Sequence, residues 1–548
     1  MRGSLVSLLV LMLAVAGPAV AQHDHAMSAP HTSAPPLFKD LGTWSHPVTA
    51  SAEAQRYFDQ GLRLYYGFNH DEAIRAFRES ARLDAKCAMA WWGVAIAAGP
   101  NINMPMDDAG AKVALAAIEQ ATALAAQTNP AEQAWIAALA VRYSDAPGAS
   151  RAALDTAYSV AMRALWKRYP DDADAGALFA ESMLDLNPWN QWARDGKPNP
   201  GTPEAVAALE VVLNKQPDHP GANHFYIHAL EASDDPARAL QSAKRLESLM
   251  PGAGHLVHMP SHIYARTGRY AESLERNKLA AAVDEKYIAE QKPQGMYPLM
   301  YYNHNLQFIW FSAMMEGRSA ESMAAARKLA GNVSNESIAQ IPMLEFVPTY
   351  PVMTSARFGR WDDALKEPLP PASQRFASAL CHYARGLAFA AKGQFGPART
   401  ELDALRASAV LVPAEMTVSI NNAGLLTRVA TQTLAGEIAA RSGDEDAGVE
   451  LLRAAVATED SLHYDEPPTW CYPVRHMLGA TLMRAGRAKA AEAVYRDDLR
   501  RHPENGWSLL GLAQALRKLG ETKEADQLLA RHRKAWANAD VRLPGSAY

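Results

Sequence analysis

Cysteine is scarce in this chain: Cys87, Cys381 and Cys471 are the three cysteines among 548 residues, and they lie far apart. A small fold held by several disulfides has more cysteines at closer spacing, so that class of protein is excluded. A single bridge between two of them remains open, and three buried thiols are the interpretation that we favour. The fold must therefore be stabilised chiefly by the packing of side chains.

Long apolar runs are also missing, since no stretch reaches the roughly 20 residues that a membrane-spanning helix needs. The run from Leu5 to Ala16 is shorter. It follows Arg2 and precedes Ala19-Val20-Ala21, which is typical of a cleaved secretory signal. We therefore expect residues 1–21 to be a signal peptide and the mature protein to be periplasmic or secreted, with no insertion into a membrane.

Basic clusters and nucleotide-binding motifs are absent too. The formal net charge is −5 at pH 7 and no block of Lys and Arg stands out, so we expect no nucleic-acid partner. The sequence has no glycine-rich phosphate-binding motif, and the short stretch GAGH at Gly252 is a junction between repeats. No pattern of Ser, His and Asp for acyl transfer is present either. Metal chemistry and ligand binding are the functions that remain to consider.

Residues 22–50 form a leader rich in His, Met, Ser and Pro, which begins QHDHAMSAPHTSAPP. Such a composition buries little apolar surface, so we expect this segment to be disordered. Imidazole and thioether groups together suit copper, and a short His-rich tract binds metal loosely. A plain polar leader without a binding role is the alternative.

The main signal in the sequence is an internal repeat of helical segments. In a copy near the start, Gly61 is followed twelve residues later by Ala73 and then by Phe77. In a copy near the end, Gly479 and Ala491 have the same spacing. Small residues at these fixed places let two antiparallel helices approach closely.

This spacing resembles that of the tetratricopeptide repeat family over residues 51–535, with the weakest match between about 100 and 170. The resemblance implies an all-α, right-handed solenoid of about nine or ten helix pairs, with a concave groove on its inner face. Residues 536–548 then form a C-terminal tail. The middle section, about 171–315, also resembles a group of exported bacterial repeat proteins of unknown activity.

Five of the 17 histidines crowd into a stretch of 50 residues in this middle section. Their spacing follows the repeat, because His224 and His258 are 34 residues apart, as are His228 and His262. His255 precedes His258 by three residues, which places both on one face of a helical turn. The family resemblance places these positions on the first helices that line the groove.

We expect the five histidines to bind a transition metal, since first helices of neighbouring repeats pack about 8–10 Å apart and imidazoles from both can reach one ion. Imidazole suits zinc, copper, iron and nickel, and we favour copper or zinc. Phe225 follows His224 where zinc metalloproteases have a glutamate, so the pair is not that motif. Pro260 is expected to kink or to start a helix, which weakens the argument that His255 shares the face.

Carboxylates are candidates for proton acceptors in a metalloenzyme, and we single out Glu181, Glu231 and Asp465. Repeat spacing places Glu181 in the groove one repeat before the histidines and His304 one repeat after them. Asp465 and Glu466 reach the histidines only if the solenoid curls enough. The alternative function is a metal-free scaffold whose groove binds a peptide or protein partner, with histidines that only form hydrogen bonds.

Two inserted segments interrupt the repeats, at residues 187–205 (NPWNQWARDGKPNPGTPEA) and 463–476 (HYDEPPTWCYPVRH). Loops that interrupt a rigid scaffold often carry function. We expect the first, which is rich in Trp, to cover the groove. For the second, a rigid connector with an exposed acidic pair is the simpler interpretation.

Overall fold

The computed structural model describes residues 34–293, 296–470 and 472–548. The expected signal peptide, residues 1–21, lies outside the described residues, as do residues 22–33 of the leader. Within the described ranges the chain is almost wholly helical. The two short strands β1 (Thr417–Val418) and β2 (Asn421–Asn422) pair antiparallel in one loop. The expectation of an all-α fold is confirmed.

The helices have the following bounds. In chain order they are α1 Ala52–Tyr66, α2 His70–Leu83, α3 Ala88–Ala97, α4 Asp108–Leu124, η1 Ala125–Gln127, α5 Pro130–Ala140, α6 Arg151–Arg168, α7 Ala173–Leu184, α8 Thr202–Lys215, α9 Pro220–Leu230, η2 Pro236–Ala239, α10 Leu240–Leu249, α11 Gly254–His258, α12 Pro260–Arg266, α13 Tyr270–Gln291, η3 Tyr297–Tyr301, α14 Tyr302–Met315, α15 Ser319–Gly331, α16 Asn335–Gln340, η4 Pro342–Thr349, α17 Tyr350–Arg357, α18 Trp361–Lys366, α19 Arg375–Ala391, α20 Phe395–Val410, α21 Ala423–Arg441, α22 Glu445–Glu459, α23 Val474–Arg484, α24 Ala488–Arg501, α25 Gly506–Lys518 and α26 Thr522–Ala535.

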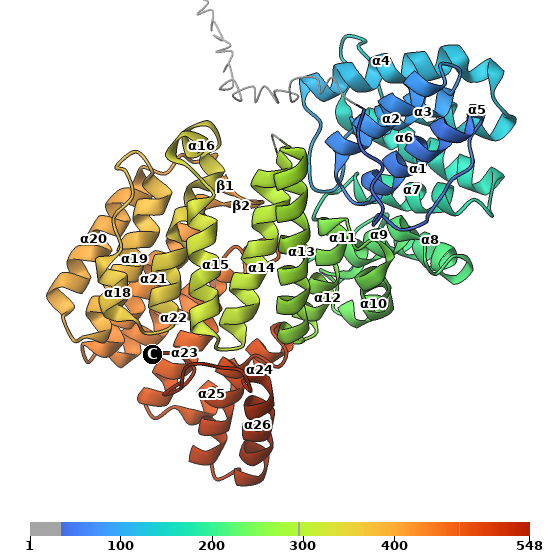
Figure 1. The fold of residues 1–548 in the computed structure, drawn as a ribbon. Helices are drawn as coiled ribbons and strands as arrows, with labels where there is room; N and C mark the ends of the chain where they lie inside the picture. The colour runs from blue at the N-terminus through green and yellow to red at the C-terminus, as the bar shows by residue number, and fades with distance from the viewer. Residues whose placement is uncertain (1–33, 294–295, 471) are drawn as a thin grey trace, which may run out of the picture.

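Consecutive helices pack as pairs, which stack side by side into a solenoid (Figure 1). The pairs run from α1/α2 to α25/α26 and number twelve when α11 and α12 are counted together as the partner of α13. This is somewhat more than the nine or ten expected. Residues 100–170 depart from the repeat spacing and yet contribute to α3/α4 and form α5/α6, because an amphipathic helix pair needs only buried faces and not the family's consensus.

The small and aromatic positions of the repeat fit together between neighbouring pairs. A Cβ on Gly61 would come within 2.7 Å of the Phe77 ring, and one on Gly93 within 2.4 Å of the same ring. Tyr495 has the same relation to Gly479 and Gly511, at 2.3 and 2.4 Å. The aromatic ring of a second helix therefore lies between the first helices of two successive pairs, which explains why these positions recur.

The leader differs from the expectation, because its residues from 34 to 50 are packed on the first pairs rather than disordered. Leu41 is buried, and the Trp44 indole Nε1 donates a hydrogen bond to Asp174 Oδ1 at 3.0 Å. His46 Nδ1 lies 2.8 Å from Asp174 Oδ2. Its overall composition is polar, but its few apolar residues and one buried carboxylate partner are enough to order it. The C-terminal tail is likewise packed, and Ser546 is fully buried.

Two cysteines are described, and both Cys87 and Cys381 are free and buried, as the favoured interpretation expected. Cys471 lies outside the described residues. Among the helices in the described ranges, none combines the length and the apolar character that crossing a bilayer requires.

The solenoid folds back on itself, so that its last pairs lie against its middle (Figure 1). The Trp507 indole donates a hydrogen bond to the Met314 carbonyl at 3.1 Å, and the Trp536 indole donates to that of Met315 at 2.9 Å. The Arg266 guanidinium reaches from α12 to the Arg501 carbonyl on α24 at 3.2 Å. Segments far apart in sequence are thus brought around α12, where the buried apolar residues divide into two separate clusters.

We predict that the fold-back contact at Gly268 contributes to stability. Gly268 has φ +75°, and a Cβ there would meet the Pro503 carbonyl oxygen at 2.5 Å. The matched control is Gly393, which has φ +72° and no atom within 4 Å of its built Cβ. Gly393→Ala should cost about 1 kcal/mol from backbone strain alone. Gly268→Ala should cost at least about 1 kcal/mol more, since a main-chain atom cannot move aside. Equal shifts of the two thermal unfolding midpoints would contradict this.

Candidate metal centre

The five histidines project from two neighbouring first helices, α9 and the pair of short helices α11 and α12. His224 and His228 lie on α9, and His255 and His258 lie on the short α11. His262 lies on α12, which begins at Pro260. Met259 between them has helical angles, φ −49° and ψ −37°. The backbone is therefore helical on both sides of Pro260, and this proline does not turn His255 away from the groove.

The structure sorts the histidines into two groups of three rather than one group of five. In each group the candidate ligand atoms lie within 4.8 Å of one another. We call them the first triad and the second triad. The first triad is His224, His228 and His255, and the second is His258, His262 and His304. His304 comes from α14 and is partly exposed, whereas the other five are at most 2% exposed.

Most of the imidazoles are held by an oxygen atom on their Nδ1 side. In the first triad, His224 Nδ1 lies 2.7 Å from the Tyr66 carbonyl oxygen and His228 Nδ1 lies 3.0 Å from Glu231 Oε1. In the second triad, His258 Nδ1 lies 2.7 Å from Asn277 Oδ1. A carbonyl or carboxylate oxygen only accepts, so these Nδ1 atoms carry the hydrogen and each Nε2 presents a lone pair.

The remaining two members of the second triad follow the same pattern. His262 Nδ1 lies 2.7 Å from Glu466 Oε2 and 2.9 Å from Glu231 Oε2. His304 Nδ1 lies 3.2 Å from Gln307 Oε1. His255 is the exception, since its buried Nδ1 has no hydrogen-bond partner. Five of the six imidazoles thus have an oxygen acceptor at Nδ1, the arrangement that orients histidines toward a metal ion in proteins.

The Nε2 atoms meet inside the cluster. His224 and His255 approach at 3.1 Å and His258 and His262 at 2.8 Å, in each case between the two Nε2 atoms. His228 Nε2 is buried without a hydrogen-bond partner. Two lone pairs repel at such distances, so a proton or a metal ion must lie between the facing atoms of a pair.

In the second triad, the pKa shifts of the imidazoles show which of the two facing nitrogens carries this proton. Burial lowers the pKa of His224, His255 and His258 well below the ordinary value and that of His304 to about 3. Burial also opposes a charge on His262, but Glu231 and Glu466 outweigh it and raise the pKa of His262 to about 10. His262 is therefore an imidazolium in the metal-free protein, and its Nε2 donates to His258.

Apolar and aromatic side chains enclose both triads. The Phe68 ring lies 4.4, 5.9 and 5.3 Å from the rings of the first triad, and the Phe308 ring lies 4.8 to 5.1 Å from those of the second. Trp189, from the insertion, contacts His228 at 5.8 Å. Phe68 and Trp189 both have positive φ, at 54° and 59°. Such strained backbone tends to cluster at functional sites.

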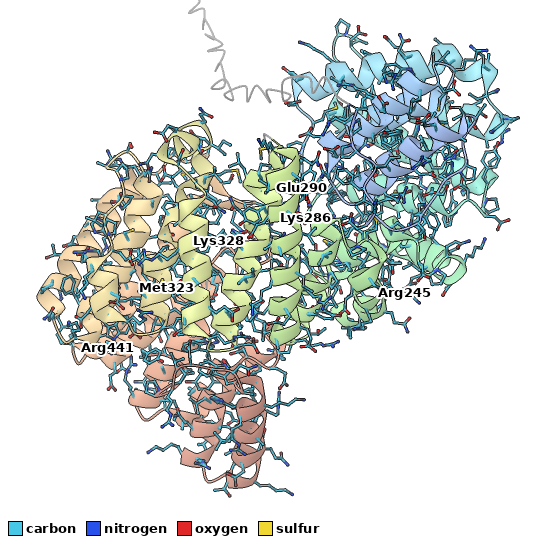
Figure 2. All side chains as sticks on the ribbon, viewed as in Figure 1. Arg245, Lys286, Glu290, Met323, Lys328 and Arg441 are labelled. Atoms are coloured by element: carbon cyan, nitrogen blue, oxygen red, sulfur yellow. The ribbon has the colours of Figure 1, made fainter. Side chains whose placement is uncertain are left out.

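The first insertion covers the site as expected. The Trp192 indole donates a hydrogen bond to the Ala229 carbonyl at 2.7 Å, which fixes the loop on the end of α9. Arg194 reaches the Ser461 carbonyl in the segment that precedes α23. The first insertion therefore contacts the chain just before the second insertion. By contrast, charged side chains such as Arg245, Lys286 and Lys328 project from the outer surface of the solenoid (Figure 2).

The carboxylates singled out from the sequence lie in three different places. Glu231 contacts both triads through His228 and His262. Asp465 accepts a hydrogen bond from the Thr469 hydroxyl at 2.5 Å, whereas its neighbour Glu466 reaches His262. The second insertion is thus more than a connector, because it delivers Glu466 across 204 positions of sequence.

Glu181 lies away from the imidazoles, in a separate buried network. It accepts a hydrogen bond from the Tyr65 hydroxyl at 3.0 Å. Burial and the nearby Asp185 raise the pKa of this carboxyl well above its ordinary value. Arg142 pairs with Asp185 at 2.7 Å in the same network. These contacts describe a structural cluster at the base of α7.

Several residues of the site carried no signal in the sequence. Tyr66 contributes only a main-chain carbonyl, which any residue has. Asn277 and Gln307 lie on helices whose polar residues look like ordinary surface positions. Phe68 and Phe308 read as core aromatics. His304 was found by repeat arithmetic alone.

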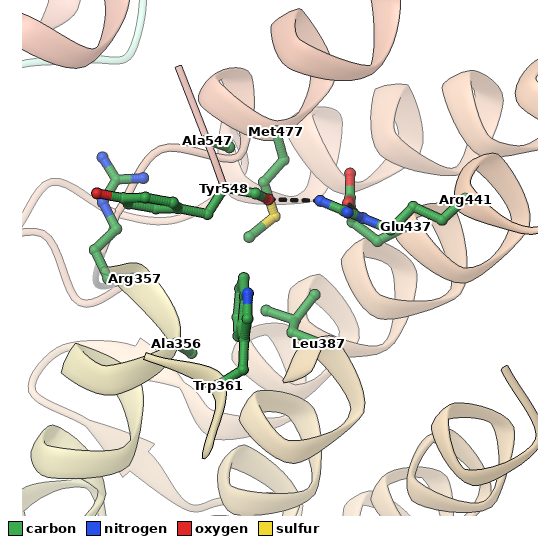
Figure 3. A pocket seen from close by; sticks show the side chains of 9 residues that line it. All are labelled: Ala356, Arg357, Trp361, Leu387, Glu437, Arg441, Met477, Ala547 and Tyr548. Atoms are coloured by element: carbon green, nitrogen blue, oxygen red, sulfur yellow. Dashed lines mark hydrogen bonds and ion pairs between the residues drawn. The ribbon is translucent and has the colours of Figure 1, made fainter. Parts of the chain in front are cut away.

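Two other features of the structure are weaker candidates for metal binding. Asp174 gathers His46, Trp44 and the Tyr66 hydroxyl, so its lone pairs are already used. A cavity of about 20 Å³ lies in the C-terminal half, where Arg441 donates to the Tyr548 main-chain oxygen at 2.5 Å (Figure 3). No histidine is among the residues that line this cavity.

Comparison with known proteins supports the fold. Residues 482–542 match the family model of the tetratricopeptide repeat. This segment is a tetratricopeptide repeat. The match spans α24 to α26, so the resemblance inferred from small and aromatic spacing is confirmed at this end of the solenoid.

Solved structures with a similar outline are distant. The human IFIT1 dimer with m7Gppp-AAAA is 11% identical, with 87% of this chain and 89% of that chain covered and a TM-score of 0.34. Yeast Tom70 is 12% identical, with coverages of 89% and 97% and a TM-score of 0.33. Such values carry no inference about function. No curated protein matches the chain.

We predict that stability of the metal-free protein falls as pH rises from 7 to 10. The pKa of His262 is raised above its ordinary value of 6.5 to about 10, so its contribution is complete below 6.5 and is lost as pH rises through 10. Glu466→Gln removes one of the two charges that favour the imidazolium. It should lower the free energy of unfolding by about 3 kcal/mol at pH 7 and by less at pH 10.

The measurement is thermal unfolding with a chelator present, from pH 7 to 10. Glu437→Gln is the matched control, because Glu437 pairs with Arg441 at 2.7 Å outside both triads. Burial opposes the charge on Glu437, but Arg484 and Arg441 outweigh it and lower its pKa, and arginine stays charged over this range, so the control should run parallel to the wild type. Parallel curves for Glu466→Gln and the wild type would refute the charged His262.

Proposed function

We propose that this chain binds transition-metal ions through the histidine cluster of its two triads. The observation that carries the proposal is the common orientation of the imidazoles. Five of the six have Nδ1 on an oxygen acceptor, which turns their Nε2 atoms into the cluster, and once His262 loses its proton all five of these Nε2 atoms have a lone pair for a metal ion. His228 Nε2 is buried without a hydrogen-bond partner, whereas a cluster needed only for hydrogen bonding would pair it with a donor.

The electrostatics of the cluster favours metal binding as well. Metal ligands must be unprotonated, and burial already lowers the pKa of His224, His255 and His258. The proton on His262 has to leave when a metal ion binds the second triad. Glu231 and Glu466 then remain as carboxylates that offset part of the positive charge of the ion.

Copper and zinc are the ions that we propose. The ligand set is all imidazole, without a thiolate, which suits both ions. Iron and nickel also accept imidazole. The leader adds histidine and methionine near the N-terminus, and a signal-like segment precedes it. We accordingly place the protein in the periplasm or outside the cell, where such ions are handled.

A catalytic role is a further step of this proposal. Glu231 is the best placed of the three carboxylates, since it contacts imidazoles of both triads. Glu181 and Asp465 are held by Tyr65 and Thr469 instead. Each triad supplies three imidazoles, and a catalytic zinc site typically combines three protein ligands with one water or substrate.

A metal-free scaffold for a peptide or protein is the second candidate. One observation favours it: a groove of about 270 Å³ between α13, α14 and α15 combines apolar Leu306 and Ile309 with charged Lys278, Glu285 and Lys328. Apolar surface rimmed by charges is typical of peptide-binding sites. This groove is separate from the histidine cluster, so the two functions are compatible.

We predict that protein lacking residues 1–33 and any affinity tag takes up at least about one equivalent of copper or zinc. Replacing His224, His228, His258 and His262 together by alanine should abolish this uptake. His382→Ala, outside both triads, should leave it unchanged. Metal analysis after dialysis gives the stoichiometry, and circular dichroism shows whether each variant is folded. Less than about a tenth of an equivalent of any transition metal in folded wild-type protein, before and after loading, would refute the proposal.

A further inference from the structure

We propose that the two triads hold a pair of metal ions and that the pair shares one small bridging anion, of the class of hydroxide or azide. This inference rests on the proposed function, since it concerns how many ions the cluster binds and what else they bind. The sequence led us to expect one ion with five histidine ligands. The geometry points to two sites of three ligands each.

The triads are close enough for their ions to be neighbours. The rings of His228 and His262, from different triads, have centroids 5.9 Å apart. Those of His255 and His258 are 5.7 Å apart. Distances between rings of the same triad cover the same range, from 4.7 to 6.3 Å. Two ions bound by these imidazoles would therefore be neighbours.

Glu231 couples the two triads directly. Its Oε1 lies 3.0 Å from His228 Nδ1 in the first triad, and its Oε2 lies 2.9 Å from His262 Nδ1 in the second. One carboxylate thus orients one ligand of each site. Carboxylates in such positions orient histidine ligands at metal centres, so Glu231 links the geometry of the two sites.

Each triad is also shielded on one side by a single phenyl ring. Phe68 contacts all three imidazoles of the first triad. Phe308 contacts all three of the second. Each of these phenyl rings contacts the imidazoles of one triad, and between the triads imidazoles face each other directly, as His228 does with His262 and His255 with His258. A ligand that completes the coordination of one ion from the side facing the other triad therefore lies beside the second ion as well.

Charge balance identifies the class of this ligand. Two divalent ions bring four positive charges into a site where Glu231 and Glu466 are the carboxylates in contact with the triads, and uncompensated buried charge is costly. Arg266 adds positive charge 3.9 Å from Glu466. An anion between the ions offsets part of this excess positive charge. The Tyr301 ring is 4.8 Å from that of His255, so a side chain with a hydroxyl donor lies beside the first triad.

The test uses the protein without residues 1–33, loaded with Cu(II). We expect about two ions per chain, whose spins couple so that the paramagnetic resonance signal is much weaker than that of two isolated ions. Azide should bind at about one per copper pair and change the visible spectrum. His304→Ala removes a ligand of the second triad only. It should reduce the stoichiometry to about one ion and restore the signal of an isolated Cu(II).

Two further variants keep the outcome clear. Glu231→Gln keeps its size but has a single carbonyl oxygen for two imidazoles, so the affinity for copper should fall by at least about tenfold. His382→Ala should behave as the wild type. If His304→Ala does not fold, His304→Gln replaces it, because an amide has nearly the same volume and is a poor copper ligand.

The outcomes separate the two proposals. If folded protein binds no copper or zinc, the proposed function fails and this inference fails with it. If it binds one ion, or two ions with the full signal of uncoupled Cu(II), metal binding stands and the paired centre is refuted. Azide binding to each copper independently would refute the bridge. Two coupled ions with one azide per pair support the inference.

Discussion

Burying six imidazoles is the constraint on which the rest of this structure depends. A neutral imidazole carries one N–H that must meet an acceptor, and a charged one must meet a carboxylate. In the cluster these needs are met from outside, by Tyr66, Glu231, Asn277, Gln307 and Glu466. The inner nitrogens are left facing one another, which is unfavourable unless something positive lies between them.

The curvature of the solenoid brings these acceptors to the imidazoles from distant parts of the chain. Tyr66 ends α1 in the first repeat, and Glu466 lies in the segment before α23 near the other end. Both reach the same cluster because the N-terminal pairs pack on α9 and the C-terminal pairs fold back toward α12. A straight stack of repeats would leave His262 with Glu231 alone. The closing contacts of Arg266, Trp507 and Trp536 therefore position the cluster as well as stabilise the fold.

The repeat period made half of the site predictable. A 34-residue spacing stacks His224 over His258 and His228 over His262, and counting one repeat further finds His304. What the period does not encode is non-periodic contact. Glu466 and Asp465 are neighbours in sequence, and only the turn of their loop decides that Glu466 meets His262 while Asp465 meets Thr469. The prediction that residues 34–50 are disordered is wrong for a related reason. It rested on average composition, which hides the few side chains that pack on the fold, such as Leu41 and Trp44.

The proton on His262 connects the metal-free form with the metal-bound form that we propose. Glu231 and Glu466 are both buried, and the pKa of Glu231 is lowered to about 2 by His262 and His228 although burial opposes this. A positive charge is therefore required beside these carboxylates in either form. Without metal the imidazolium of His262 supplies it, and with metal the ion does. Because the same carboxylates stabilise both states, exchange of proton for metal needs no rearrangement of the repeats. The rigid solenoid and an exchangeable site are thus compatible.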